Sequence, residues 1–245
     1  MVRDSRRDKE YFDQSITVLL DETKFFEKSA VEVEKGISPG LGGAIYSGYL
    51  RIVISLYSAG YSIGYVKEKY LETIDKVDFL VASLSGDQEQ GLTLNFYNNL
   101  LWTASLAVLL DVDEKYFLKI ADSFKVIDKP DRLIDLLLSY KLKDIEVCGD
   151  SYYSRVSDKM ADRYRSLLSV FETDQKEKQV AILRDHLKLW YKRQQLCTWY
   201  GSHNKQGYFG YWSFETAAVA KILKISNASL STNRYFPNGF LLDPK

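Results

Sequence analysis

Apolar residues recur every three or four positions along most of the chain, whereas the apolar and polar alternation of a strand extends over no useful length. The spacing therefore predicts an all-α fold. Helices are expected over nine stretches, about residues 4–34, 44–59, 62–84, 88–110, 113–124, 130–146, 154–171, 174–200 and 211–225. We expect these to form a compact bundle of about seven to nine helices.

The stretch that begins at Ser62 combines a buried stripe with an acidic face. Its apolar positions step by three or four residues: Ile63, Val66, Tyr70, Ile74, Val77, Val81 and Leu84. Glu68, Glu72 and Asp75 fall on the opposite face of this helix, and Asp78 flanks them. Acidic residues at helical spacing usually form a solvated surface, so this pattern alone assigns them no chemistry.

Polar residues mark three of the expected helix starts. Asp113 is placed to cap the helix that follows it. Pro130 and Asp131 open another helix, because proline is tolerated in a first turn and aspartate suits the positive end of the helix dipole. Asp174 and Glu177 have the spacing of a capping box.

Two helix ends are similar to each other in sequence. AVLLDVD, residues 107–113, aligns with AKILKIS, residues 220–226. In both, a helix ends in an apolar residue and a capping residue starts another turn. Convergent helix-end chemistry and an internal duplication both explain the match, and both stay open.

The composition is that of a folded protein and not of a disordered one, with 46% hydrophobic and 27% charged residues. A chain of 245 residues buries enough surface to need no disulfide or metal. Cys148 and Cys197 lie far apart in the sequence, and we expect both to be reduced. No apolar leader and no membrane span is visible, so we expect a cytoplasmic protein.

The formal net charge is zero, but the charges are unevenly distributed. Residues 62–150 hold 16 Asp and Glu against 10 Lys and Arg, a difference of minus 6, and residues 151–245 hold 8 against 15, a difference of plus 7. Such local asymmetry steers binding partners even when the total charge vanishes.

No motif for catalysis, metal binding or a cofactor is convincing. His186 and His203 are the only histidines and lack a zinc-ligand spacing, and His186 at the edge of an apolar stripe is expected to be a partly buried structural residue. The glycine loop at residues 40–43 lacks the Lys-Ser/Thr of a phosphate-binding loop. We therefore expect no metal and no cofactor.

The basic, aromatic-rich carboxy-terminal half offers an alternative function, a helical module that binds nucleic acid. Most of its aromatic residues, however, fall on apolar stripes or lead into a buried helix, and core packing explains them better. The residues concerned are Trp190, Tyr191, Trp199, Tyr200, Tyr208, Tyr211 and Trp212.

Glu215 is a single carboxylate in the middle of the apolar arc of the last expected helix. Burial of an unpaired carboxylate is costly, so we expect a structural buried acid that is hydrogen-bonded or ion-paired. Arg184 and Gln194 are its candidate partners.

Five segments resemble signature sequences of the PoNi immunity proteins, which neutralise polymorphic-toxin nucleases. The carboxy-terminal ones are GYWSFETAA (210–218), ISNASL (225–230) and YFP (235–237), and the amino-terminal ones are LYSAGY (56–61) and WTASLAVLL (102–110). The resemblance implies two regions, residues 1–125 and 130–245, that pack as one all-helical unit. It also implies a non-enzymatic partner of a cognate DNase toxin that a bacterial secretion system delivers, with no direct contact to nucleic acid or membrane.

A nuclease has a basic surface for DNA phosphates, so an inhibitor benefits from presenting carboxylates in their place. The hypothesis is therefore a toxin-binding surface of acidic residues on the helix 62–84 and near neighbouring helix ends. Its members are Glu68, Glu72, Asp75, Asp78, Asp87, Glu89, Asp111, Asp113 and Glu114. A nucleic-acid-binding module and a hydrolase with an unrecognised carboxylate site are the rival readings.

Overall fold

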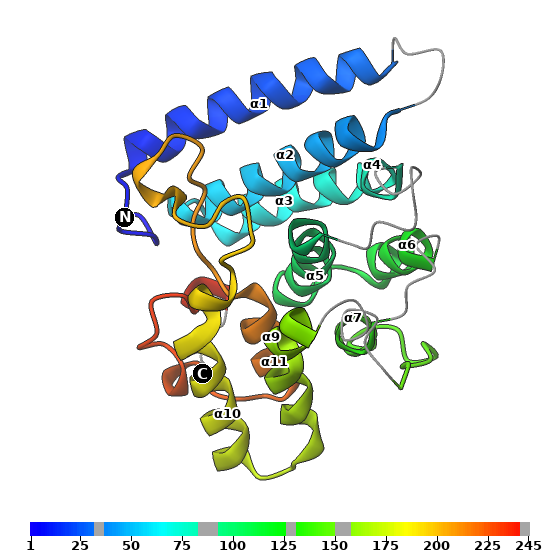
Figure 1. Cartoon of the computed structure of the whole chain (residues 1–245), viewed down its shortest axis with the longest axis vertical. Helices are drawn as coiled ribbons and strands as arrows, with labels where there is room; N and C mark the ends of the chain where they lie inside the picture. The colour runs from blue at the N-terminus through cyan, green and yellow to red at the C-terminus, as the bar shows by residue number, and fades with distance from the viewer. Residues whose placement is uncertain (32–36, 83–92, 126–130, 150–157, 241–245) are drawn as a thin grey trace. The chain divides into compact units, whose positions relative to one another are not determined.

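The computed structural model describes residues 1–31, 37–82, 93–125, 131–149 and 158–240, which fold into α-helices and contain no β-strand (Figure 1). This confirms the all-α prediction. The ten α-helices of these ranges are α1 Lys9–Val31, α2 Pro39–Ser58, α3 Ile63–Ile74, α4 Val77–Ala82, α5 Leu94–Leu109, α6 Glu114–Lys125, α7 Arg132–Leu138, α9 Asp158–Ser169, α10 Lys176–Arg193 and α11 Phe214–Ile222.

The chain forms two compact units, each made of segments that are distant in sequence. Unit 1 comprises residues 1–91, 122–127 and 201–210, and unit 2 comprises residues 92–121, 128–200 and 211–245. The division into residues 1–125 and 130–245 stays a prediction. Among the described helices, none has both the length and the apolar character that a membrane span requires.

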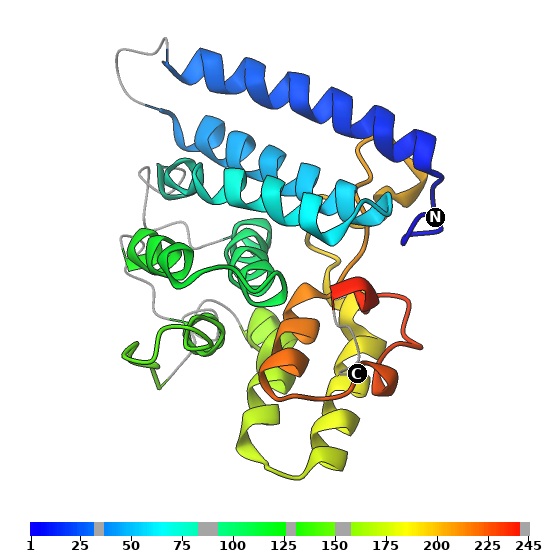
Figure 2. The ribbon, with the colours of Figure 1, turned by 180° about the vertical axis from the view of Figure 1, so that it is seen from behind.

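In unit 1, helices α1, α3 and α4 pack against α2, and α1, α2 and α3 lie side by side when seen from behind as well (Figure 2). Ser38 caps α2 by accepting a hydrogen bond from the backbone N–H of Leu41, with Pro39 at the first position. Gly48 allows α1 and α2 to approach closely, because a Cβ at this position would lie 2.2 Å from Oγ1 of Thr23. The absence of a side chain at Gly48 thus permits the short distance between α1 and α2 at this point.

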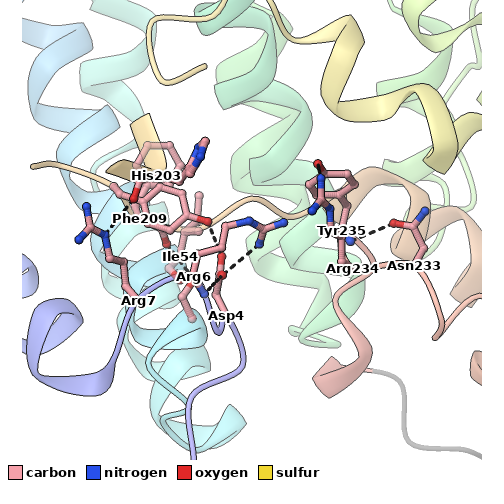
Figure 3. Close-up of polar contacts among 11 residues, drawn as sticks. Asp4, Arg6, Arg7, Ile54, His203, Phe209, Asn233, Arg234 and Tyr235 are labelled. Atoms are coloured by element: carbon pink, nitrogen blue, oxygen red, sulfur yellow. Dashed lines mark hydrogen bonds and ion pairs between the residues drawn. The ribbon is translucent and has the colours of Figure 1, made fainter. Parts of the chain in front are cut away.

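The residues before Lys9 are bound to the segment 201–210, so the first helix does not begin at residue 4 as predicted (Figure 3). The Asp4 carboxylate is buried and accepts hydrogen bonds from the hydroxyl of Tyr208 and from Arg6, at 2.5 Å and 3.0 Å. The Arg7 side chain donates to the carbonyl of His203 at 2.9 Å. These contacts hold the segment in an irregular conformation.

The predicted helix 62–84 is divided into α3 and α4. Ser62 caps α3 by accepting a hydrogen bond from the N–H of Tyr65, and Asp75 ends it. The break spans residues 75 and 76, after which α4 begins at Val77. The apolar period continues across the break into Val77, which is fully buried, so periodicity alone did not reveal it.

In unit 2, α5 is buried along almost its whole length and packs against α11 and α7, while α10 packs against α9. The aromatic side chains form ring contacts within this core, such as that of Trp190 with Trp199, whose centroids are 6.0 Å apart. Trp190, Trp199, Tyr211 and Trp212 are buried, and Tyr191 is half-buried. The interpretation of these residues as core packing is confirmed.

Helices α5 and α11 end with the same motif at the two segments that match in sequence. Asp111 and Lys224 both adopt a left-handed conformation, with φ of 46° and 53°. In each case the next amide bonds back to the helix, from Val112 to the carbonyl of Ala107 at 3.2 Å and from Ile225 to that of Ala220 at 2.9 Å. This is the hydrogen-bond pattern of a Schellman C-cap.

Of the helix starts predicted from polar residues, the one at Asp131 has a side-chain cap and the one at Asp174 has none. The Asp131 carboxylate accepts hydrogen bonds from the backbone N–H groups of Leu133 and Ile134, both at 3.0 Å, and caps α7. The prediction of a capping box at Asp174 was wrong. Helix α10 begins at Lys176, one residue later than a cap at Asp174 would require, and it has no side-chain cap.

Candidate functional site

The strongest candidate for a binding surface in unit 1 is the acidic face, defined as Glu68, Glu72, Asp75 and Asp78. All four side chains are exposed. They come from α3, its last turn and the start of α4, and the opposite side of these helices is buried against α2. The structure therefore makes this acidic group available to a partner.

A lysine of the chain itself lies among these carboxylates. The Lys69 ammonium contacts Glu68 at 3.2 Å and Glu72 at 2.6 Å, and the hydrogen bond to Glu72 raises the pKa of Lys69. The side chains of Glu68 and Glu72 nonetheless stay 61% and 56% exposed. One lysine therefore orients two carboxylates without cancelling their combined charge.

Two tyrosines adjoin the acidic face at the start of α3. The rings of Tyr61 and Tyr65 lie 5.6 Å apart, and the Lys69 ammonium lies 5.6 Å from the centroid of the Tyr65 ring. Tyr65 is exposed. Tyrosine is among the residue types that are enriched at protein interfaces.

A second acidic group, the acidic turn, lies in unit 2 between α5 and α6 and consists of Asp111, Asp113 and Glu114. All three side chains are exposed. Asp111 contacts the ammonium of Lys141 at 2.9 Å, and this hydrogen bond, with the nearby charge of Lys221, lowers the pKa of Asp111. Asp87 and Glu89, the other predicted members of the surface, lie outside the described residues.

Glu215 is fully buried in unit 2. Its Oε1 accepts hydrogen bonds from the indole N–H of Trp190 at 2.5 Å and from the hydroxyl of Ser213 at 2.8 Å. Its Oε2 has no hydrogen-bond partner within the described part of the chain. Burial raises the pKa of Glu215 to about 7, and the hydrogen bonds to the carboxylate limit the rise.

The partners proposed for Glu215 from sequence were wrong. Arg184 is exposed and donates from Nε to the carbonyl of Ser229 at 2.8 Å. Gln194 is buried, but it bonds to Asn98 at 3.2 Å. Both residues were chosen for their positions around the helix, and such a position does not indicate in which direction a long side chain points.

His186 and Cys197 are both buried in unit 2, and burial shifts the pKa of each. His186 is buried more fully than predicted, its Nδ1 lies 2.7 Å from the hydroxyl of Ser166, and burial with the neighbouring Arg193 lowers its pKa to about 3. Burial raises the pKa of the Cys197 thiol to about 12. Within the described ranges, no group of three His, Cys, Asp or Glu side chains could hold a metal ion.

The sequence analysis missed an exposed apolar feature of α1. Val18 and Phe25 are 54% and 67% exposed, although both are large and apolar. The signal was present in the sequence, because the two residues are seven positions apart and lie outside the buried stripe that includes Phe12, Ile16 and Leu19.

Comparisons with known proteins identify relatives of both halves of the chain. The model of the PoNe immunity protein (PoNi) N-terminal region matches residues 6–122, and the model of the C-terminal region of PoNe immunity proteins (PoNi) matches residues 129–240. No curated protein matches the sequence. The crystal structure of protein PA2201 from Pseudomonas aeruginosa is similar in fold, with a TM-score of 0.65, 16% identity, and coverage of 98% of this chain and 89% of that one.

Proposed function

The chain belongs to the PoNe immunity protein (PoNi) family, and we propose that it binds a cognate bacterial DNase toxin and inhibits it by covering the toxin's basic DNA-binding surface. The action is binding and not catalysis. The toxin meets its inhibitor in the cytoplasm of the protected cell after delivery by a secretion system.

The observation that carries this mechanism is the exposure of the acidic face on one side of α3 and α4. A DNase attracts DNA through positive charge, and the same charge attracts a surface of carboxylates. The acidic turn supplies a second negative group of the same kind in unit 2. Tyr65 adds aromatic area beside Glu68, which an interface made of charges alone would lack.

Growth rescue tests the function first. The toxin is sought as the product of the neighbouring gene and co-expressed with this chain. Rescue of growth together with a stable complex of the two purified proteins is the expected result. If the chain neither rescues growth nor binds the toxin, the proposed function fails.

Charge reversal then tests the mechanism. The double variant Glu72→Lys with Asp75→Lys should weaken toxin binding at least tenfold, because it places positive charge against a basic partner, and it should leave thermal stability nearly unchanged, because both side chains are exposed. The matched control is Asp174→Lys with Glu177→Lys, an equal charge change at exposed positions in unit 2. Equal affinity of the two double variants would remove the acidic face from the interface.

A further inference from the structure

Helix α1 exposes apolar side chains that the described residues of its own unit leave uncovered. Phe25 is 67% and Val18 is 54% exposed, and the ring of Phe26 contacts that of Phe25 with centroids 5.9 Å apart. A large aromatic residue so exposed within a long helix buries little apolar area in the fold. Exposed apolar side chains that gather on one face mark interaction surfaces.

These residues share one face with two acidic neighbours. Val18 and Phe25 are seven positions apart, so they lie about 20° apart around the axis and about 10 Å apart along it. Asp21 and Glu22 lie between them in sequence, at about 60° on one side of Val18 and about 40° on the other. All four side chains are exposed, and we call them the α1 patch. The buried residues Ile16 and Thr23 point to the opposite side.

The α1 patch and the acidic face belong to the same unit, and α1 is joined to the α3 region at both ends. The hydroxyl of Tyr61 donates to Asp13 near the start of α1 at 3.0 Å, and the Lys76 ammonium pairs with Glu27 near its end. The two helices therefore run in the same direction on either side of α2 (Figure 2). A protein partner that covers a surface of typical size, about 800 Å² per side, extends well beyond a single helix.

Charge decides which occupant fits the α1 patch. A second copy of this chain docked around a two-fold axis at the middle of the patch would bring Asp21 and Glu22 against the same acidic residues of its partner. A basic protein surface with an apolar depression complements both the acidic flanks and the apolar centre. We propose that the α1 patch is a second contact surface for the DNase toxin, with Phe25 as its apolar anchor. This inference rests on the proposed function, because its occupant is the same toxin.

Affinity measurements on one substitution test the anchor. The full chain carrying Phe25→Ala is titrated against the catalytically inactivated nuclease domain of the toxin encoded in the neighbouring gene. A loss of affinity of at least tenfold is expected, because interface energy concentrates in a few large side chains. The melting temperature should not fall, because Phe25 is mostly exposed and alanine is the better helix former. Leu189→Ala, at a 47% exposed position of α10 in unit 2, is the matched control and should change affinity less than twofold.

A charge variant tests the acidic flanks independently. Asp21→Lys with Glu22→Lys should also weaken toxin binding at least tenfold. If the unaltered chain binds the toxin and Phe25→Ala binds it equally well, the proposal that the α1 patch contacts the toxin is refuted. The proposed function would then still stand. A concentration-dependent dimer of the unaltered chain that Phe25→Ala abolishes, with toxin affinity unchanged, would overturn it in favour of a second copy. Absence of toxin binding by the unaltered chain would instead refute the proposed function.

Discussion

Replacing Glu215 by glutamine should remove one pH-dependent component of stability. The carboxyl is fully buried, its pKa is raised to about 7, and the ordinary value is 4.5. The folded chain therefore holds the Glu215 proton more tightly than the unfolded chain does. Its contribution to stability is fully present below pH 4.5 and is lost as the pH rises through about 7.

The magnitude follows from the two pKa values of Glu215. Their difference of 2.5, from 4.5 to about 7, corresponds to about 3 kcal/mol at 1.36 kcal/mol per unit. Glutamine resembles the protonated acid, because its carbonyl can still accept from Trp190 and Ser213. The variant should therefore match the unaltered chain near pH 4.5 and exceed its free energy of unfolding by about 3 kcal/mol at pH 8.

The assay is urea denaturation of both proteins at pH 4.5 to 8, followed by circular dichroism. Only the difference between the two proteins is informative, because His186 titrates in an overlapping range with the opposite sign. Glu177→Gln, the same substitution at an exposed position of α10, serves as the control for the chemical change itself. A flat difference for Glu215→Gln would refute the reasoning, since it would mean that this carboxyl titrates alike in the folded and unfolded chains.

Two further predictions concern the cores of the two units. His186 has a folded pKa of about 3 against an ordinary 6.5, so its contribution is present above pH 6.5 and lost as the pH falls. Relative to His186→Asn, the unaltered chain should lose up to about 5 kcal/mol between pH 6.5 and 3, and denaturation at constant ionic strength measures it; a parallel pair of curves would contradict it. Gly48→Ala should destabilise the protein by about 1–3 kcal/mol, because the new Cβ would overlap Thr23. Adding Thr23→Ala should restore much of the melting temperature, and no recovery would show that the cost arises elsewhere.

The sequence was sufficient for those features that a single helix determines. Helical periodicity placed the stripe of α3, and it placed Glu215 within the apolar arc that the structure buries. It failed where a side chain from elsewhere decides the outcome. Asp4 would continue α1 by pattern alone, but its hydrogen bond to Tyr208, 204 positions away, holds the chain in another conformation.

The partners of Glu215 show the same limit more sharply. A positional argument favours a charged or amide donor on the preceding helix, and Arg184 met that condition. The structure uses the indole N–H of Trp190 instead, which an inventory of charged residues does not contain. Because tryptophan combines a large apolar surface with one donor, it can line a core and bond to a carboxylate at the same time.

Charge counting from sequence does not show which acids of unit 1 face outward. Asp13 and Glu27 of α1 are engaged within the unit, by Lys9 and Tyr61 at one end and by Lys76 at the other. These two acids thus contact groups of their own unit at the two ends of α1. Carboxylates on the outer sides of the same helices, such as Glu68 and Asp21, stay exposed. The division of acids into those that join helices and those that face outward is thus a tertiary property, because it depends on which donors of the folded unit lie within reach of each carboxylate.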